Sequence, residues 1–387
     1  MESADGLIVV AYDLFIERET ATDRFIRTKI KALSQIFPDI TIITNRVNGH
    51  SEDYVKVITP KISFSSKILN IGYLNLFALI SIHKIKKNVK GKKPIVYTLG
   101  SFFIFLAAYL KFFLGIKVVV DVDTWFMCYD YSEVKATFLW YVLEKFIEPI
   151  NKLFYSICIN EFEADYLIRK GFNKNKLNIC HNVAPDLPIK EKQSCRQSLI
   201  STYGFPPDSV IVAFHGPGSA AHNRESVKMI TETAKSLQGL DRIKYLIIGS
   251  GFVPEEMIDK SLKSSFVFTG FLNNDKMYDA LRGSTIYFCP IAEGFLGGTK
   301  TKITEGAMVG LPVVTNSLGA KGFDTSSVPF LFDDDMGKSI EMLYTNPELI
   351  DSIGRQCKEY VRKNYSYSSL LSSYVNFFSE ISGYTAD

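Results

Sequence analysis

The residues best suited to chemistry stand in a glycine-rich stretch that runs from residue 297 to residue 306. Its order is Gly297-Gly298-Thr299-Lys300-Thr301-Lys302-Ile303-Thr304-Glu305-Gly306. This order predicts a loop that opens a short helix carrying two lysines and a glutamate. Backbone N–H groups, the positive end of the helix dipole and two ammonium groups would then meet at one point, which suits a diphosphate group. The glutamate, about one turn further on, can accept hydrogen bonds from a ribose diol.

The same residues allow a simpler interpretation. Lys302 and Glu305 are three residues apart, so on a helix they could form a surface ion pair worth only a few tenths of a kcal/mol. The flanking segments favour the diphosphate, because two glycines precede the pair and the turn at 310–312 leads from it into an apolar strand. We therefore expect a nucleotide site that includes Gly297, Gly298, Thr299, Lys300, Lys302 and Glu305.

The elements that would position this stretch follow a repeating strand–helix order. Apolar runs typical of buried strands cover residues 7–12, 40–44, 94–97, 118–120, 155–159 and 178–180, and helical spacing is found at 22–37, 101–114 and 161–170. The order then restarts, with strands at 210–214, 244–248, 266–268, 285–289 and 312–315, a helix from residue 223, another at 275–282, and further helices over 339–384. Apolar strands that do not alternate and are separated by helices indicate a parallel sheet covered on both faces.

The predicted fold class is therefore α/β, with two Rossmann-like, doubly wound domains whose strand carboxyl ends face a cleft. A length of 387 residues also favours two domains over one core. We expect an N-terminal domain over residues 1–185, a C-terminal domain over residues 186–365, and a helical segment over residues 366–387.

The glycine-rich stretch is similar to the donor-binding segment of group 1, family 4-like glycosyltransferases of the GT-B fold. That segment reads Gly-x-Gly-x-Lys-x-Lys-x-x-Glu and is followed by a Gly-x-Pro-Val-Val strand. Two more segments resemble the family: 214–218, which reads Phe-His-Gly-Pro-Gly, and 292–295, which reads Ala-Glu-Gly-Phe. The resemblance implies that Lys300, Lys302, Gly216 and loop amides hold a leaving diphosphate, that Glu305 holds the ribose, and that the last helix crosses back onto the N-terminal domain.

The chain departs from the family pattern at two points. Relatives often carry two glutamates eight positions apart, but the position eight before Glu305 is Gly297. Glu293 could take the role of the first glutamate through a longer loop. Relatives also place an Arg and a Lys just after the loop at Gly216, whereas residues 217–227 here contain one cation, which leaves most of the phosphate charge to the two lysines of the stretch.

Two aspartates follow a strand in the N-terminal half, in the order Val120-Asp121-Val122-Asp123-Thr124-Trp125. They would face the same side if the strand continues through both, whereas a turn beginning at Asp121 would separate them. Because related enzymes carry a similar aspartate, we expect Asp123 to act in catalysis with Lys300 and Glu293, although a turn-capping aspartate is the other interpretation. No metal is expected, since no third ligand is evident and the order of elements differs from that of the GT-A fold.

Other classes of protein find little support. The motif at 249–251 lacks the third glycine of a dinucleotide fingerprint, because Pro254 stands there, so no NAD and no other cofactor beyond the nucleotide-sugar substrate is expected. Six cysteines without a Cys-x-x-Cys pair argue against zinc and a disulfide framework and favour reduced, cytoplasmic thiols. A net charge of +3 and the lack of any binding signature give no support for nucleic acid, and no signal peptide is visible.

A basic cluster from Lys84 to Lys93 follows an apolar helix predicted at 72–82. It could be the solvated end of that helix, or it could dock the N-terminal domain on the anionic inner face of a membrane, where a lipid-linked acceptor would sit. Residues 68–82 are too short for a membrane span, and residues 101–120 are interrupted by lysines.

Together these observations predict a retaining, metal-independent glycosyltransferase of cell-surface polysaccharide or glycoconjugate assembly. It would move a sugar from a nucleotide diphosphate donor to a hydroxyl of a glycan or lipid-linked acceptor. Two alternatives stay open. A GT-B sugar-nucleotide epimerase would release UDP and a sugar, or an epimer, without an acceptor. A non-catalytic GT-B subunit would bind a partner or a glycan, which the missing glutamate and the sparse cations would allow.

Overall fold

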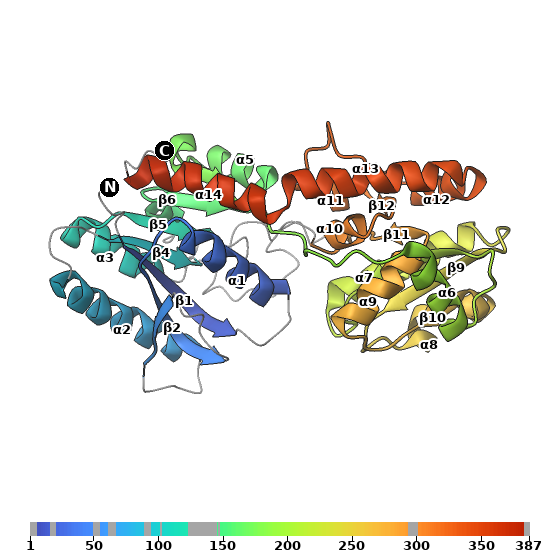
Figure 1. Ribbon diagram of the computed structural model, residues 1–387, viewed down its shortest axis with the longest axis horizontal. Coiled ribbons are helices and arrows are strands. Elements are labelled where there is room, and N and C mark those ends of the chain that lie inside the picture. Colours follow the sequence, from blue (N-terminus) through green and yellow to red (C-terminus); the bar gives the residue numbers. More distant parts are fainter. Residues whose placement is uncertain are drawn as a thin grey trace. The chain divides into compact units, whose positions relative to one another are not determined.

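The computed structural model describes residues 6–15, 21–48, 55–60, 67–88, 94–100, 103–122, 145, 148–292 and 301–382 (Figure 1). The chain divides into two compact units, one of residues 1–183 with 367–387 and one of residues 184–366. Each unit is a parallel sheet with helices on it, which confirms the predicted α/β class. Within the described ranges, no helix combines the length and the apolar character needed to cross a membrane.

Unit 1 contains a seven-stranded parallel sheet in the order β3-β2-β1-β4-β5-β6-β7. Its strands are β1 (Leu7–Phe15), β2 (Ile40–Asn48), β3 (Val55–Ile58), β4 (Ile95–Leu99), β5 (Val118–Asp121), β6 (Tyr155–Cys158) and β7 (Leu177–Ile179). Side chains of the central strands alternate between two cores, as period-two geometry requires: Ile8 and Val10 enter one, Leu7 and Val9 the other. Both faces of the sheet are therefore covered.

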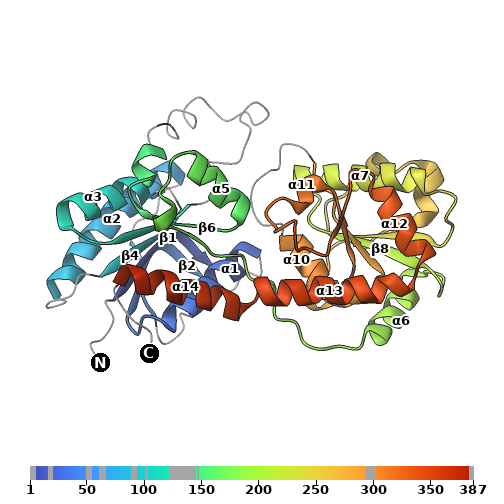
Figure 2. The ribbon, with the colours of Figure 1, turned by 90° about the horizontal axis from the view of Figure 1, so that it is seen from above.

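Helices of unit 1 divide between those two faces (Figure 2). The helices are α1 (Ala21–Ser34), α2 (Lys67–Asn88), α3 (Ile104–Leu114), α5 (Glu161–Arg169) and α14 (Tyr367–Ser382), with a short 3-10 turn, η3 (Lys174–Lys176). Apolar residues of α2, α3 and α5 fill the core that contains Ile8, whereas those of α1 and α14 fill the core that contains Leu7. The last helix of the chain thus belongs to the core of the first unit.

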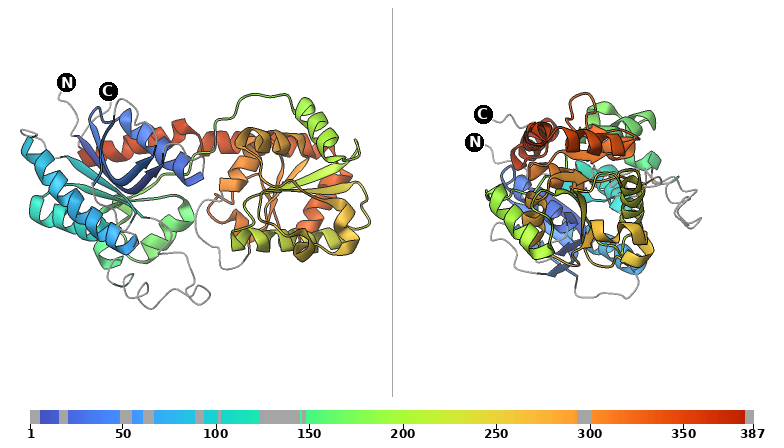
Figure 3. Two further views of the ribbon diagram at one scale, coloured as in Figure 1. Left: turned by 90° about the horizontal axis from the view of Figure 1, so that it is seen from below. Right: turned by 90° about the vertical axis from the view of Figure 1, so that its right-hand side faces the viewer.

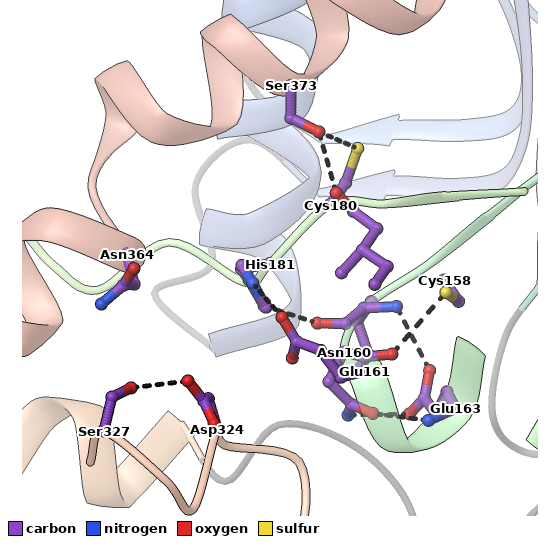
Figure 4. Close-up of polar contacts among 12 residues, drawn as sticks. Cys158, Asn160, Glu161, Glu163, Cys180, His181, Asp324, Ser327, Asn364 and Ser373 are labelled. Atoms are coloured by element: carbon purple, nitrogen blue, oxygen red, sulfur yellow. Dashed lines mark hydrogen bonds and ion pairs between the residues drawn. The ribbon is translucent and has the colours of Figure 1, made fainter. Parts of the chain in front are cut away.

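Hydrogen bonds tie α14 and α5 to the strands beside them (Figure 4). Ser373 on α14 donates to the carbonyl of Ile179 at 2.8 Å, which joins the helix to β7. Asn160 caps α5 by accepting from the backbone N–H of Glu163 at 2.8 Å, and the Glu163 carboxylate accepts from the N–H of Ile159 at 3.2 Å. The first bond satisfies a donor that the first turn of the helix leaves free, and the second holds the residue before the cap.

Unit 2 contains a six-stranded parallel sheet in the order β10-β9-β8-β11-β12-β13 (Figure 1). Its strands are β8 (Val210–His215), β9 (Ile243–Ile248), β10 (Phe266–Phe268), β11 (Ile286–Phe288), β12 (Val313–Thr315) and β13 (Leu331–Phe332). Its helices are α6 (Lys192–Tyr203), α7 (Ala221–Ser236), α8 (Pro254–Met257), α9 (Asn274–Gly283), α10 (Thr301–Met308), α11 (Ser317–Ala320), α12 (Met336–Thr345) and α13 (Glu348–Asn364), with the 3-10 segment η4 (Lys260–Ser265). One continuous apolar core holds this unit together.

Two strands of the structure had no counterpart in the prediction. β3 is four residues long and only partly buried, and β13 has two residues, so neither presents the apolar run that marks the other strands. The predicted boundaries fell after residues 185 and 365, and the structure divides the chain after residues 183 and 366. None of the five cysteines that the structure describes forms a disulfide, and all five are buried.

Candidate functional site

The strand order of unit 2 reverses direction between β8 and β11, which are neighbours in the sheet. Connections from adjacent strands leave in opposite directions at such a point, so the loops that follow these two strands open a crevice at the carboxyl edge of the sheet. The β8 loop carries Gly216 and leads into α7. The β11 loop leads through the glycine-rich stretch into α10. Both segments that resemble the donor-binding family therefore start at one edge of one sheet.

Glycines allow the β8 loop to lie directly on the loop after β9. Gly216 donates to the carbonyl of Ile248 at 2.9 Å, and Gly218 donates to the carbonyl of Ser250 at 2.8 Å. A Cβ on Gly218 would stand 2.5 Å from backbone atoms of Gly251, so no other residue fits there without a shift of the backbone. The motif at 249–251 thus supports the neighbouring loop.

Lys302 lies beside Gly216 in this crevice. Its ammonium group donates to the Oδ1 of Asn223 on α7 and stands 5.2 Å from the ring centre of Phe214. Gly216 has a φ of +151°, and a Cβ there would lie 2.8 Å from the Lys302 Nζ, so the glycine leaves room for the lysine. Burial lowers the pKa of Lys302, because desolvation disfavours the charged form.

Glu305, one turn along α10, is held in a buried polar network. Its carboxylate accepts from Nε2 of His215 at 2.8 Å and from the hydroxyl of Tyr278 at 3.0 Å, while the hydroxyl of Tyr287 lies 3.0 Å from Nδ1 of His215. With Glu305 ionised, the Nε2 atom that faces it carries a proton. Gly306 makes this packing possible, since a Cβ there would stand 2.2 Å from the Tyr287 ring.

The start of the β11 loop is fixed by side chains from other elements. Asn316 brackets Ile291, because its Oδ1 accepts from the N–H at 3.1 Å and its Nδ2 donates to the carbonyl at 2.8 Å. Ser226 on α7 donates to the carbonyl of Pro290 at 2.7 Å, and Thr315 donates to that of Cys289 at 2.7 Å. The loop thus leaves the sheet at a defined place.

The structure brings Gly216, Lys302 and Glu305 of the predicted site together. The surface ion pair is a poor description of the last two, because Lys302 is bonded to Asn223 and Glu305 is bonded to His215 and Tyr278, all within unit 2. The other predicted site residues lie outside the described ranges: Asp123, Glu293, Gly297, Gly298, Thr299 and Lys300.

Roles for four residues of this network were not predicted from the sequence. His215 and Asn223 stand in or near the Phe-His-Gly-Pro-Gly segment. The signal that could have found them was a polar residue, His215, directly after a predicted strand. Tyr278 and Tyr287 come from α9 and β11, and nothing in their local pattern connects them to Glu305.

In unit 1, Asp121 is buried in the core rather than free for catalysis. Its carboxylate forms an ion pair with Lys29 of α1 and accepts from the hydroxyl of Tyr97 at 2.6 Å. The Tyr97 hydroxyl lies 3.3 Å from that of Tyr374 on α14, and burial raises the pKa of both tyrosines. Asp121 therefore joins α1, β4, β5 and α14. Among the residues that the structure describes, no group of three or more His, Cys, Asp and Glu could hold a metal ion.

Residues 210–346 match the family of glycosyl transferases group 1. The chain carries a group 1 glycosyltransferase domain. That domain coincides with the part of unit 2 that holds β8 to α12, and it includes the whole network around Lys302 and Glu305. The predicted family is thus confirmed for this part of the chain.

Solved structures of similar fold extend over both units of this glycosyltransferase. Sucrose-phosphate synthase from Thermosynechococcus elongatus has a TM-score of 0.66 and 12% identity, with 97% of this chain and 99% of that chain covered. HepE from Anabaena, in complex with UDP and glucose, has a TM-score of 0.64 and 10% identity, with 96% and 99% covered. WaaG, a glycosyltransferase involved in lipopolysaccharide biosynthesis, has a TM-score of 0.62 and 12% identity, with 96% and 98% covered. The GT-B fold is confirmed by these likenesses. No curated protein sequence matches the chain.

Proposed function

We propose that this enzyme transfers a sugar from a nucleotide diphosphate donor to a hydroxyl group, with the donor bound in unit 2. The observation that carries the proposal is the position of Lys302 at the sheet's switch point. A partly buried lysine whose pKa is lowered by desolvation stands beside Gly216 of the β8 loop, between the first turns of α7 and α10. An anion that displaces water there would gain a charge-assisted hydrogen bond and would relieve the cost of the buried ammonium.

The chemistry assigned to this site is departure of the nucleotide diphosphate. Negative charge develops on the leaving diphosphate as the bond to the sugar breaks, so cations and N–H groups fixed around it lower the barrier. Lys302 supplies one charge, and Lys300, with the amides of Gly297, Gly298 and Thr299, belongs to the same proposal. Gly216, whose own N–H is bonded to Ile248, contributes the space that a side chain would fill. In this mechanism those groups take the place of a metal ion, and the sugar keeps its anomeric configuration, as the family resemblance implies.

Glu305 is assigned to the ribose of the nucleotide. Each carboxylate oxygen has two acceptor positions, so the oxygens that accept from His215 and Tyr278 can still accept from a ribose hydroxyl. Because the carboxylate is already held in place, little order is lost when the nucleotide binds. Glu293 and Asp123 are assigned to the sugar and the acceptor, respectively, on the family resemblance alone.

The acceptor is proposed to be a glycan or a lipid-linked saccharide of polysaccharide or glycoconjugate assembly at the inner face of a membrane. HepE is known in complex with UDP and glucose, and WaaG acts in lipopolysaccharide biosynthesis, which supports a nucleotide sugar as the donor and a surface glycoconjugate as the product. The lysines from 84 to 93 support peripheral contact of unit 1 with anionic lipid, since each lysine near such a surface favours binding.

The test is an incubation of the full chain with a panel of nucleotide sugars, with and without membrane lipid extract as an acceptor source, and detection of the released nucleotide diphosphate. Release that depends on the extract supports transfer. Release of nucleotide and free sugar, or an epimer, without any acceptor would indicate the epimerase. No turnover of any donor, together with tight glycan binding, would favour the non-catalytic subunit.

A matched pair of variants connects the result to the site. Lys302→Met should abolish the release of nucleotide diphosphate, whereas Lys228→Met on α7 should keep it, because Lys228 forms an exposed ion pair with Glu225. If both variants release nucleotide diphosphate at the wild-type rate, the donor is bound elsewhere.

A further inference from the structure

Unit 1 contains a long segment of one charge sign. Residues 54–120 include eleven lysines and no Asp, Glu or Arg, although the whole chain has a formal charge of only +3. The described part of this segment forms β3, α2, β4, α3 and most of β5. The excess of positive charge is therefore concentrated in part of one unit, where no carboxylate from the segment itself can neutralise it.

The same segment exposes large apolar side chains on α3. Phe105, Phe112 and Phe113 are 61%, 60% and 76% exposed. Their spacing of seven and eight residues puts them on one side of the helix, whereas Leu106 and Leu110 face the core. An amphipathic helix of a globular domain would carry polar residues on that outer side, so this helix is apolar on both sides.

The outer side of α2 continues this surface. Leu69, Leu76 and Ile80 are about half exposed and recur at helical spacing. The two helices lie side by side on one face of the sheet (Figure 3), and the rings of His83 on α2 and Tyr109 on α3 are 6.1 Å apart. We call these outer sides of α2 and α3 the α2/α3 surface. Large exposed apolar groups elsewhere in the described structure are scattered, as in Ile189 and Phe271, which is ordinary for a protein surface.

Lysines accompany the apolar groups on this surface. Lys84 is exposed one turn beyond Ile80, and Lys86 is half-buried in the last turns of α2. The Nζ of Lys111 on α3 lies 5.9 Å from the ring centre of Phe112 and donates to the carbonyl of Leu153. Burial lowers the pKa of Lys111, and the charge of Lys176 adds to that effect.

We propose that the α2/α3 surface is the part of unit 1 that inserts into an anionic phospholipid bilayer. Exposed phenylalanines and leucines gain from entering the boundary between head groups and acyl chains, and the surrounding lysines gain from anionic head groups. The excess of positive charge decides between a second copy of the chain and a bilayer as the partner of this surface. A second copy of this chain would place lysines such as Lys84 and Lys86 against their equivalents, whereas an anionic bilayer complements them. This surface would make the membrane contact that is part of the proposed function, on which the inference rests, and it does not depend on the donor site.

The test is flotation of the full chain with vesicles of phosphatidylcholine, with and without phosphatidylglycerol. The wild type should float with the anionic vesicles and should be released as salt rises. Phe112→Ser combined with Phe113→Ser should lower the partition coefficient at least ~10-fold, because burying one such ring contributes more than a tenfold factor. Phe271→Ser, at a site in unit 2 that is 79% exposed, is the matched control and should float as the wild type does.

Charge is tested separately by Lys84→Ser combined with Lys86→Ser, which should weaken flotation only with the anionic vesicles. The proposal is overturned if the wild type stays with the free protein at low salt, or if the double phenylalanine variant floats unchanged. A dimer in sedimentation that the phenylalanine substitutions dissociate, without vesicle binding, would instead make the surface an interface between copies. Binding of a nucleotide diphosphate in solution, which needs no membrane acceptor, should be the same in all these variants, so failure of flotation leaves the donor site intact as a hypothesis.

Discussion

Lys302→Met separates a binding role from a structural one. A binding role predicts weaker nucleotide affinity with little change in stability, whereas a structural role predicts the reverse. The substitution keeps the length of the side chain and removes its charge. Without a ligand, the loss of the bond to Asn223 and the relief of the buried ammonium oppose each other, so the free energy of unfolding should change by less than ~1.5 kcal/mol. With a nucleotide diphosphate, the loss of a charge-assisted bond should weaken binding by about 1.5–3 kcal/mol, a ~12- to ~160-fold rise in Kd.

Thermal unfolding with added nucleotide diphosphate measures both quantities on the same samples. At a ligand concentration of ~100 times the wild-type Kd, the wild type should gain about 2.7 kcal/mol of stability. At that same concentration the variant should gain only about 0.3–1.3 kcal/mol. Lys228→Met, which breaks an exposed ion pair on α7, should gain as much as the wild type. A folded Lys302→Met protein with the full ligand-dependent gain would refute the assignment of this lysine to the diphosphate.

The lowered pKa of Lys302 adds a pH dependence with a definite sign. Burial disfavours the ammonium in the free folded protein, so the pKa of Lys302 is lower in the folded state than in the unfolded state. Between these two pKa values the folded state binds fewer protons than the unfolded state, and the free energy of unfolding therefore rises with pH. A bound diphosphate favours the ammonium and raises that pKa again. Nucleotide affinity should therefore fall as pH rises through the pKa of the free protein, which calorimetry in buffers of different ionisation enthalpy can detect as proton uptake. Affinity that is flat over this range would show that Lys302 does not meet the ligand.

Three further substitutions test the remaining elements. Glu305→Gln should lower nucleotide affinity in calorimetry. It should also lower stability without nucleotide, because one amide cannot accept from both His215 and Tyr278 as the carboxylate does. Unchanged affinity would remove the ribose role. Asp121→Asn should destabilise the protein by about 3–5 kcal/mol in denaturant titration, because it leaves the buried ammonium of Lys29 without its counter-charge, and a loss below ~1 kcal/mol would contradict the burial. Gly306→Ala should cost about 1–3 kcal/mol through contact with a buried tyrosine, whereas Gly72→Ala, on a helix with nothing within 4 Å, should be neutral or stabilising.

The fold could be predicted from the sequence because its strands are continuous apolar runs. β1, β8 and β9 are buried on both faces, so their composition alone separates them from the helices between them. β3 and β13 could not be found in this way. Each lies at one edge of its own sheet, and its short, partly exposed segment contains no continuous apolar run.

The site could be predicted only as far as it is local in sequence. Lys302 and Glu305 share one helix, and their spacing with the neighbouring glycines suggested a ligand. The partners of that pair come from other elements: Asn223 from α7, Tyr278 from α9 and His215 from β8, between 27 and 90 residues away from the groups they contact. Contacts over such separations follow from the sheet order, which period and composition do not specify. Asp121 shows the same limit, because only the structure reveals Lys29 beneath it.

The placement of α14 has a consequence for the order in which the protein is made. Leu370, Tyr374 and Phe378 fill the core between α1 and the sheet of unit 1, yet they leave the ribosome after every residue of unit 2. Unit 2 can complete its core as soon as α13 has emerged. Unit 1, although its strands are synthesised first, must wait with one apolar face covered only in part, by α1. The domain that is begun first is therefore finished last. During that interval the nascent chain exposes a sheet face that chaperones would be expected to bind.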